Sequence, residues 1–244
     1  NNQSSLTLQI DNTIAPAFNP TTESIALTTP SSYIINPNAP VAVVSGNASV
    51  SPMGAANYNV PIDVLPGSGG MQPNLSVVYN SQGGNGLLGL GFDLAGISAI
   101  IRVPQTNYFN GQFNDVSLDY NDRFAWDGNR LELNTIASNG VSYGKAGSIY
   151  FTETETNTII TAYETTGNGP KYFKIITSDG KILEFGNTTD SRVLLTGLNT
   201  PYMYLLNRIT DHNGNYMDFT YKQNNGETYL INIKYTGNIN DNQQ

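Results

Sequence analysis

The chain of 244 residues contains no cysteine. Disulfide bridges, thiolate nucleophiles and cysteine-based zinc or iron–sulfur sites are therefore excluded. It also has a single histidine, His212, whereas nucleophilic hydrolysis needs a base beside the nucleophile, most often histidine. His212 lies between Asp211 and Asn213 in a predicted hairpin turn, and no G-x-S-x-G sequence presents a serine. We interpret His212 as a solvated turn residue, and the sequence disfavours acyl-transfer chemistry.

Charge is also scarce. Charged residues make up 12% of the chain, about half of the usual ~25%, so Asn, Ser, Thr, Gln and Gly must solvate the surface. With 11 basic and 19 acidic residues the net charge is −8, which repels phosphate backbones and anionic lipids. We therefore predict that the chain does not bind nucleic acid.

Long hydrophobic runs are missing as well. The run 97–103 is far shorter than the ~20 residues that a membrane-spanning helix needs. No charged and then apolar signal peptide opens the chain. We predict a soluble, already processed protein with no membrane span.

What the sequence has in abundance is the alternation of apolar and polar residues. From Ala55 onward a period of two dominates, as in 215–222, where Met217, Phe219 and Tyr221 share one face. Apolar spacing typical of helices is not sustained over more than ten residues. The predicted fold is all-β, with many short antiparallel strands joined by tight hairpins into a sandwich or curled sheet, and very little helix.

Four dipeptides supply the positive φ angles that tight hairpins need: Asp127-Gly128, Asp179-Gly180, Asn213-Gly214 and Asn225-Gly226. The segment 200–210 is open to a helical turn as well as to a strand. With these turns in place, we predict strands at 58–65, 74–80, 97–103, 123–126, 130–133, 148–152, 158–164, 171–177, 181–185, 192–195, 203–210, 215–222 and 228–235.

The chain divides by composition into two parts. Residues 1–52 are rich in Asn, Pro, Ser and Thr, and their only charged residues are Asp11 and Glu23. Such a segment buries little apolar area, so we predict an extended leader or arm, with a flexible linker as the alternative. Residues 53–244 are predicted to form the β-rich module.

A glycine-rich segment contains the spacing of a nucleotide site. Residues 84–89 match G-x-G-x-x-G after a predicted strand, but that site works only when a helix N-terminus follows. The continuation 90–96 is too rich in glycine for a stable helix, and no βαβ alternation follows. We predict no cofactor here. Instead, Gly89 and Gly91 are expected to adopt buried positive φ angles, so that valine at either position would lower the melting temperature.

Metal binding is disfavoured by a similar mismatch. Residues 211–215 resemble the first half of a calcium loop, but the glycine comes too early and Lys222 stands where a bidentate glutamate is needed. We therefore predict a turn without metal. Weak calcium binding between loops stays an alternative, because oxygen-bearing side chains are plentiful in 115–122 and 238–242.

Carboxylates and aromatic residues leave two further alternatives open. Glycoside hydrolysis requires two carboxylates across a cleft, and the candidates by residue type alone are Glu153, Glu155, Glu164 and Glu184. Each is more simply an outward-facing strand residue. Fifteen tyrosines and Trp126 offer material for a sugar-binding face, although cross-strand packing is the commoner use of such residues.

Several ordered stretches resemble one family. Residues 54–67, 70–81, 84–94 and 100–102 look like the opening of the SpvB N-terminal, toxin-complex B-component and Rhs (YD-repeat) family. Residues 122–131 and 205–215 resemble its later signatures. The residues that carry the resemblance are Tyr58, Pro61, Pro66, Gly67, Gly70, Pro73, Tyr79, Asn80, Gly86, Gly89, Gly91, Arg102, Asp127, Gly128, Arg130, Arg208, Asp211, Gly214 and Asn215.

The resemblance implies an architectural role with no catalytic residues, cofactor or metal to carry over. In this family the module precedes β-propeller or YD-repeat segments, which curl into a hollow shell around a C-terminal effector. The implied partners are the remainder of the same polypeptide and an enclosed effector, and the implied location is secreted or at the bacterial cell surface. A carbohydrate- or cell-surface-binding β module is the alternative, and a hydrolase is the remote one.

The last two predicted strands look like one YD-type repeat around Asn225-Gly226. A chain that ends shortly after a strand would leave a sheet edge open, and open edges are normally paired or blunted. We therefore expect a following segment to cover this edge.

Overall fold

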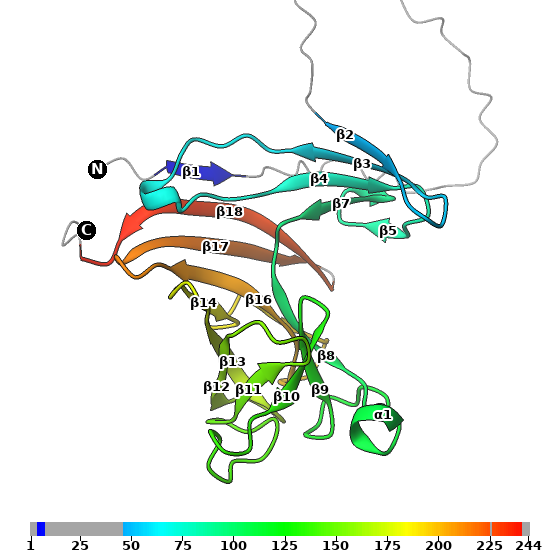
Figure 1. The fold of residues 1–244 in the computed structure, drawn as a ribbon, viewed down its shortest axis with the longest axis vertical. Coiled ribbons are helices and arrows are strands. Elements are labelled where there is room, and N and C mark those ends of the chain that lie inside the picture. The colour runs from blue at the N-terminus through cyan, green and yellow to red at the C-terminus, as the bar shows by residue number, and fades with distance from the viewer. Residues whose placement is uncertain (1–3, 8–45, 225, 241–244) are drawn as a thin grey trace, which may run out of the picture.

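The computed structural model describes residues 4–7, 46–224 and 226–240. The predicted all-β class is confirmed, since the described helical segments are only the four-residue α1 (Asn107–Asn110) and the single turn η1 (Ser68–Gly70). Among the described residues, no helix has the length and apolar character needed to cross a membrane. Two sheets make up the fold (Figure 1).

The larger sheet contains a closed barrel. Each barrel strand pairs antiparallel with the next, and β16 returns to pair with β8 through Met203–Leu205 against Ala99–Ile101. The barrel strands in order are β8 (Ala99–Val103), β9 (Arg123–Trp126), β10 (Asn129–Leu133), β11 (Ile149–Thr152), β12 (Ile159–Thr165), β13 (Pro170–Ile176), β14 (Ile182–Phe185) and β16 (Pro201–Thr210).

Strand β16 is the junction of the molecule. On one edge it pairs with β14 and with the short β15 (Arg192–Leu194). On the other edge, residues 203–205 pair with β8, whereas residues 208–210 pair with β17 (Asn215–Asn224). β17 pairs in turn with β18 (Glu227–Asn238), and β18 pairs with β1 (Ser4–Thr7). The sheet therefore leaves the barrel at β16 and continues as a curved extension (Figure 1).

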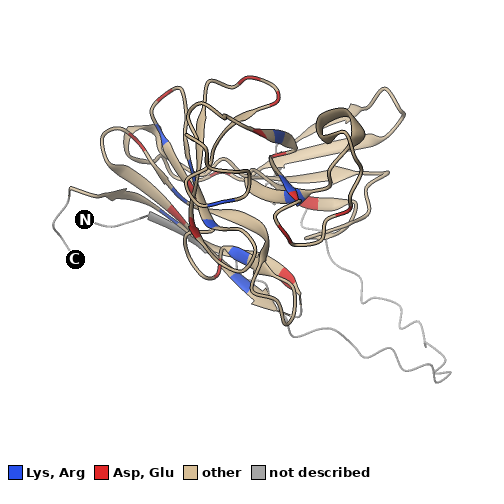
Figure 2. Cartoon of the chain, turned by 90° about the horizontal axis from the view of Figure 1, so that it is seen from below, with Lys and Arg blue, Asp and Glu red and all other residues tan. Residues whose placement is uncertain are grey.

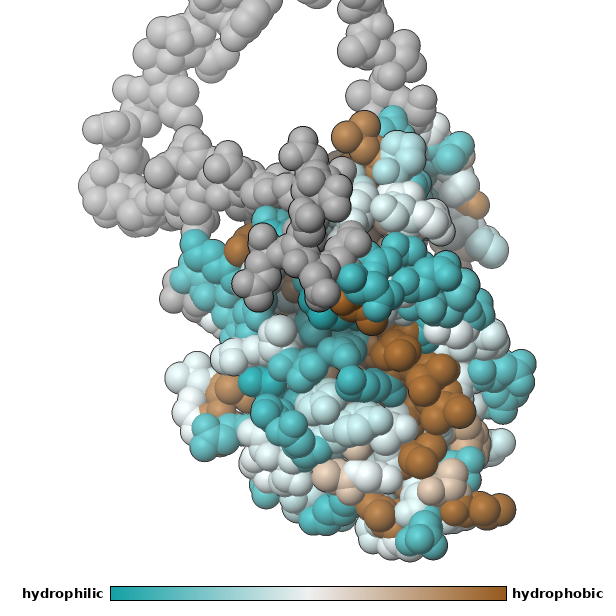
Figure 3. Space-filling view, turned by 90° about the vertical axis from the view of Figure 1, so that its left-hand side faces the viewer, coloured by the Kyte–Doolittle hydropathy of each residue, from teal (hydrophilic) through white to brown (hydrophobic). Residues whose placement is uncertain are grey.

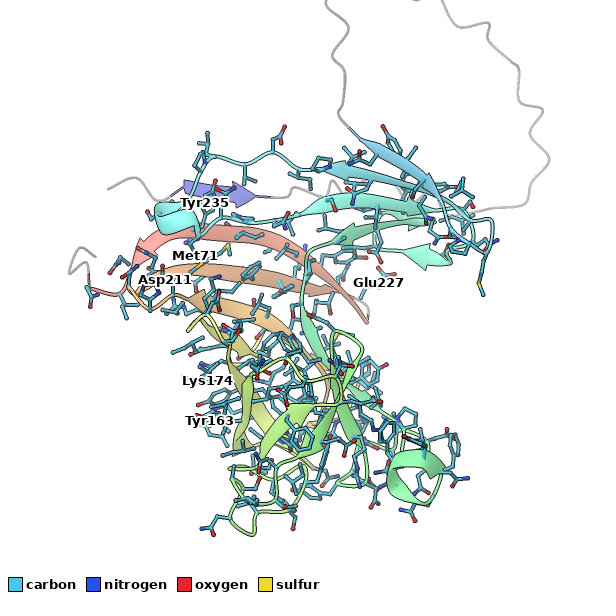
Figure 4. All side chains as sticks on the ribbon, in the orientation of Figure 1. Met71, Tyr163, Lys174, Asp211, Glu227 and Tyr235 are labelled. Carbon is cyan, nitrogen blue, oxygen red and sulfur yellow. The ribbon has the colours of Figure 1, made fainter. Side chains whose placement is uncertain are left out.

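The second sheet lies over this extension (Figure 1). Met71 and Leu75, 5% and 3% exposed, belong to the same buried cluster as Leu230 and Tyr235 of β18. Figure 4 shows Met71 beside Tyr235, between the two layers. The strands of this second sheet in spatial order are β2 (Asn47–Val50), β3 (Ala56–Pro61), β4 (Ser76–Asn80), β7 (Phe92–Ala95), β6 (Gly89–Leu90) and β5 (Asn85–Gly86).

The barrel interior is aromatic. Phe124, Tyr150, Phe173 and Tyr204 are each at most 1% exposed, and the rings of Phe173 and Tyr204 meet edge to face at 4.9 Å. The inward residues alternate with outward ones, as in β13, where Phe173 is buried while its neighbours are partly exposed. This alternation of buried and exposed side chains is why period two in the sequence predicts the strands correctly.

Every predicted strand overlaps an observed one, and the segment 200–210 forms a strand from Pro201 onward. The strands that the sequence did not predict are β1, β2, β5, β6 and β7. β5 and β6 have two residues each, and β7 has four. The two-residue strands cannot display a period of two, because alternation needs about four to eight residues to be recognised, and β7 is at the lower limit of that range.

The predicted turn dipeptides lie between strands, as expected. Among those whose two residues are both described, only Asp127-Gly128 forms a two-residue turn in which both φ angles are positive. Asp127 and Gly128 have φ of 46° and 81° between the paired residues Trp126 and Asn129. This combination is that of a type I′ hairpin. Gly180, Gly214 and Gly226 also have positive φ. Asn225 lies outside the described residues.

The prediction of an open sheet edge at the last strand is wrong. β18 pairs with β17 on one side and with β1 on the other. Ser4 lies opposite Tyr235, so the two segments that meet here are far apart in the sequence. Periodicity cannot reveal such a pairing. The predicted division between residues 52 and 53 falls between β2 and β3, which pair with each other, and residues 8–45 of the predicted arm lie outside the described residues.

The glycine-rich segment gives a first testable prediction. Gly89 and Gly91 both have positive φ, but Gly89 is exposed, whereas a Cβ atom on Gly91 would lie 2.7 Å from the Asn80 carbonyl oxygen. Gly91 is only partly buried, so the expectation that both glycines are buried is wrong at both positions. We expect Gly91→Val to lower the free energy of unfolding by about 1–3 kcal/mol through backbone strain, and more than Gly89→Val. Thermal unfolding measures the stability of both variants. Equal unfolding midpoints for wild type and Gly91→Val would show that position 91 does not require glycine.

Candidate functional site

The sequence-predicted signature residues do not converge on one site. Tyr58, Pro61, Tyr79, Asn80, Gly86 and Gly89 lie on strands of the second sheet, and Gly91 directly precedes β7. Pro66, Gly67, Gly70 and Pro73 lie in the connection between β3 and β4. Arg102, Asp127, Gly128 and Arg130 belong to the β8–β10 part of the barrel, and Arg208, Asp211, Gly214 and Asn215 surround the β16–β17 turn. This distribution is typical of residues that shape a fold.

Arg102 forms the centre of a buried polar network. Its guanidinium group lies 3.0 Å from the Asp122 carboxylate, and both side chains are 1% exposed. The same group donates hydrogen bonds to the carbonyl oxygens of Pro201, Asp119 and Asn168. Asp122 also accepts a hydrogen bond from the Ser117 backbone N–H at 2.8 Å. The network ties β8 to the α1–β9 connection, to the β12–β13 loop and to the start of β16.

A second basic signature residue of the barrel, Arg130, is also engaged. Arg130 donates to the Pro104 carbonyl at 3.0 Å and to Asn110 Oδ1 at 2.9 Å, which fixes the loop around α1. Its Nε atom lies 3.4 Å from Glu132. Burial raises the pKa of Glu132, and the nearby Arg130 charge opposes that rise.

The β16–β17 turn is held by its own side chains. Asp211 accepts hydrogen bonds from the backbone N–H groups of Asn213 and Asn215, both at 2.8 Å, and from Asn215 Nδ2 at 2.7 Å. Desolvation acts to raise the pKa of Asp211, but the hydrogen bonds from Asn215 and Asn213 outweigh it and hold the pKa below its usual value. His212 is exposed in this turn, as predicted. Hydrogen bonds from its own residues to Asp211 therefore stabilise the turn.

A row of paired charges runs along the outer face of the larger sheet, from the barrel onto β17. Lys174, Glu184, Arg208 and Asp218 lie directly opposite one another on four neighbouring strands. Lys174 Nζ lies 2.8 Å from Glu184, and Arg208 binds Asp218 with two contacts of 2.6 and 2.7 Å. Figure 4 shows Lys174 and Tyr163 on the same side of the barrel, and Figure 2 shows how few charged residues the rest of the chain has.

The charge row gives a prediction about acid stability. Burial acts to raise the pKa of Glu184, but hydrogen bonds from Lys174 and Asn187 outweigh it and lower the pKa. Folding therefore favours the ionised form of Glu184. Its contribution to stability is fully present above the unfolded-state pKa of about 4.3, and it is lost as the pH falls through the lower pKa of the folded state. We expect Glu184→Gln to cost up to about 1 kcal/mol at pH 7 and less at pH 3.

Urea unfolding of wild type and Glu184→Gln at the two pH values measures this difference. The matched control is Glu164→Gln, which removes an ion pair with Lys171 whose two side chains are 56% and 38% exposed. If Glu184→Gln lowered the stability equally at pH 7 and pH 3, the ionised form of Glu184 would not be what stabilises the fold.

Beside the charge row, four apolar side chains face the solvent. Ile159, Ile176 and Ile182 lie opposite one another on β12, β13 and β14, and they are 54%, 45% and 37% exposed. Phe151 on the adjoining β11 is 40% exposed, and alternation places it on the same outer face. We call Phe151, Ile159, Ile176 and Ile182 the apolar row. The side of the molecule shown in Figure 3 carries a continuous brown band over the barrel.

A hollow lies on the second sheet. We call it the sheet groove: its volume is about 560 Å³, within the roughly 300–1,000 Å³ of ligand pockets. It is lined by five asparagines, by Tyr58, Tyr79 and Phe92, and by Asp93, with glycines at one end. Sequence reasoning missed both this groove and the apolar row, because each depends on which strands are neighbours.

None of the catalytic candidates gains a reactive environment among the described residues. A second groove of about 380 Å³ is lined by Glu184, Asp190 and Asp218. Lys174 pairs with Glu184, Arg208 pairs with Asp218, and Asp190 accepts a hydrogen bond from the Tyr221 backbone N–H at 2.8 Å. The glutamates Glu153, Glu155 and Glu164 are exposed. The G-x-G-x-x-G segment forms β5 and β6 and is not followed by a helix.

No cluster of three or more possible metal ligands occurs in the part of the chain that the structure describes. Burial raises the pKa of Tyr204 and of Tyr221 far above the usual range. Their hydroxyl groups donate to backbone carbonyls, Tyr204 to Pro170 at 2.8 Å and Tyr221 to Leu206 at 2.7 Å. These tyrosines therefore act as neutral hydrogen-bond donors that join strands.

Solved structures share this fold at low sequence identity. The crystal structure of TcdB2-TccC3 is 19% identical with a TM-score of 0.57, and covers 77% of this chain and 10% of that chain. The Tc holotoxin pore of Photorhabdus luminescens is 18% identical with a TM-score of 0.56, over 78% of this chain and 10% of that one. The N-terminal domain of the effector protein SpvB from Salmonella typhimurium strain LT2 is 19% identical with a TM-score of 0.56, over 72% and 64%. A search of curated protein sequences finds no significant match.

The chain is thus an all-β module, a closed barrel whose sheet continues beneath a second sheet, and it shares its fold with part of these toxin-complex structures. The family model described as "Salmonella virulence plasmid 65kDa B protein" matches residues 50–244. The chain belongs to this SpvB family, which confirms the resemblance found in the sequence. It spans about a tenth of the length of the toxin-complex chains that it matches.

Proposed function

We propose that this chain is a non-catalytic structural module at the N-terminal end of a much longer, secreted or surface-located bacterial polypeptide. The module forms a rigid part of a β-shell, and its partners are the following segments of the same polypeptide. The family match and the length of the toxin-complex chains that share the fold support this proposal.

The apolar row is the observation that carries the proposal. Soluble proteins scatter exposed apolar side chains singly, whereas contiguous apolar patches mark interaction sites. Here four such side chains stand on adjacent strands of a rigid barrel wall. A neighbouring segment of the same polypeptide that packs on this wall would remove them from water, at a gain of about 25 cal/mol for each Å² of apolar surface buried.

The shell that we propose helps to enclose a C-terminal effector. A container of this kind needs walls that do not open, and paired edges provide them, because an unpaired strand edge is a site of slippage and aggregation. The barrel closes on itself through β16 and β8, and β18 is paired on both sides. These features suit a wall better than a catalytic scaffold.

The test compares the 244-residue chain with the full natural polypeptide. Ile176→Lys changes an exposed residue, so we expect the unfolding midpoint of the 244-residue chain to stay nearly unchanged. In the full polypeptide the same change should expose segments beyond residue 244 to limited proteolysis. Ile136→Lys is the matched control, because Ile136 is 91% exposed and lies outside the apolar row. Equal protease resistance of wild type and Ile176→Lys in the full polypeptide would refute the proposal.

A further inference from the structure

β1 is attached to the rest of the fold by one short strand pairing. Its four residues pair with residues 232–235 of β18, and within the described chain β1 has no second strand neighbour. We propose that this edge of β18 is a strand-exchange site, at which β1 of one copy of the chain replaces β1 of another copy. The inference is tested apart from the shell role, because the apolar row takes no part in it.

The pairing of β1 is short enough to open. A four-residue strand makes few backbone hydrogen bonds, and each contributes modestly because water replaces it when the strand detaches. Ordering the backbone of those residues costs conformational entropy, which opposes this gain. By contrast, β17 pairs with β18 over a long stretch, from Asn215 to Asn224. We therefore expect β1 to detach many times while the pairing of β17 with β18 stays intact.

β18 extends beyond the part that β1 covers. It spans Glu227–Asn238, and residues 227–231 have no strand partner on the β1 side in the described part of the chain. Unpaired backbone N–H and C=O groups at a strand edge are a template for another strand. An incoming strand can therefore begin to pair beside β1 and then take its place.

The connection between β1 and β2 is long enough to reach a neighbouring copy. Thr7 and Asn47 are separated by 39 residues, 8–46, and a chain of that length spans at most about 130 Å. β2 is an edge strand of the second sheet, and Figure 1 shows it well apart from β1. No tight turn therefore holds β1 beside the next described strand, and its exchange requires no change in the pairing of the other strands.

A second copy of this chain is the partner that fits the edge. The segment Ser4–Thr7 pairs with β18, and every copy carries that segment. In an exchanged pair, each β1 forms the same backbone hydrogen bonds with β18 of the other copy, so no contact is lost. The balance between the two arrangements then depends on the chain concentration, relative to the effective concentration of β1 near its own β18. Exchange should therefore increase with chain concentration.

The lack of cysteine in the chain makes the exchange measurable by disulfide trapping. Ser5 lies opposite Lys234, and paired Cα atoms of antiparallel strands are about 4.5–5.5 Å apart, within the roughly 4.4–6.8 Å that a disulfide needs. The double variant Ser5→Cys/Lys234→Cys should therefore form a disulfide within one chain in dilute solution. Lys234 is exposed, so its replacement should leave the fold intact.

The test of exchange mixes two single variants of the 244-residue chain, Ser5→Cys and Lys234→Cys, under a mild oxidant. We expect a mixed disulfide dimer, identified by mass spectrometry, which increases with concentration and which an excess of a peptide of residues 1–10 suppresses. The matched control mixes Ser5→Cys with Lys222→Cys, because Lys222 is also exposed but lies on β17, which does not pair with β1. The control should give at least about tenfold less mixed dimer.

Three results would overturn the inference. The first is a mixed dimer of Ser5→Cys and Lys234→Cys that is no more abundant than the dimer in the control. The second is a mixed dimer that the peptide does not suppress, because the two thiols would then meet by random collision. The third is a double variant that forms no disulfide within one chain, because β1 would then not occupy the edge of β18.

Discussion

Replacing Arg102 by methionine is expected to lower the free energy of unfolding by about 3–5 kcal/mol, because it leaves a buried carboxylate without its partner. Asp122 is 1% exposed and cannot regain water without opening the barrel end. Three backbone carbonyls would lose their donor at the same time. Urea unfolding followed by circular dichroism measures the loss.

Two comparisons make this prediction specific. Arg102→Met combined with Asp122→Asn should recover part of the loss, since the double variant buries no unpaired charge. Lys181→Met removes a pair in which both side chains are about half exposed, and it should cost less than about 1 kcal/mol. If Arg102→Met costs no more than Lys181→Met, the buried network does not stabilise the barrel.

Phe173→Ala is expected to have an effect of similar size through packing alone. Phe173 is fully buried and contacts the rings of Phe124, Tyr150 and Tyr204. Truncating a buried phenylalanine costs about 3–5 kcal/mol, from lost transfer free energy and the cavity that remains. For a chain of this size each kcal/mol shifts the melting temperature by about 2–4 °C. Differential scanning calorimetry should therefore show a fall of about 6–20 °C.

The matched control for Phe173→Ala is Phe151→Ala. Phe151 is 40% exposed on the outer wall of the same barrel, in the apolar row. Its removal should change the stability of the 244-residue chain by less than about 1 kcal/mol. If the two variants had the same melting temperature, the aromatic cluster inside the barrel would not be the core that stabilises the fold.

The sequence predicts local structure well where the physical cause is local. Alternation identifies β17, because a half-buried strand exposes every second side chain. It also locates β18, although a register shift there buries Leu230 rather than Ile231. Asp127-Gly128 marks a hairpin, because both residues tolerate positive φ. The solvated position of His212 follows from the same turn chemistry.

Long-range pairing is what the sequence does not reveal. Nothing in residues 201–210 indicates that β16 shares one edge between β8 and β17. Nothing in Ser4–Thr7 indicates pairing with β18. Arg102 is recognisable as a signature residue, but its partners Asp122 and Pro201 become visible only once the chain has folded.

The candidate surfaces depend on this same long-range information. Ile159, Ile176 and Ile182 each end or begin a separate strand, and they form a row only because β12, β13 and β14 are neighbours in a particular register. Tyr58, Tyr79 and Phe92 come together for the same reason. A shift by one residue in any of these pairings would turn the side chains to the opposite face.

The structure of the full natural polypeptide tests the account most directly, and the exposure of Ile176 in it is the quantity to measure. Ile176 is 45% exposed in the 244-residue chain. We predict that segments beyond residue 244 cover the apolar row and bury Ile176, with the fold of the described residues between 47 and 238 unchanged. An apolar row that stays open to solvent, or a natural polypeptide that ends at Gln244, would contradict the proposal that this module is a wall of a larger shell.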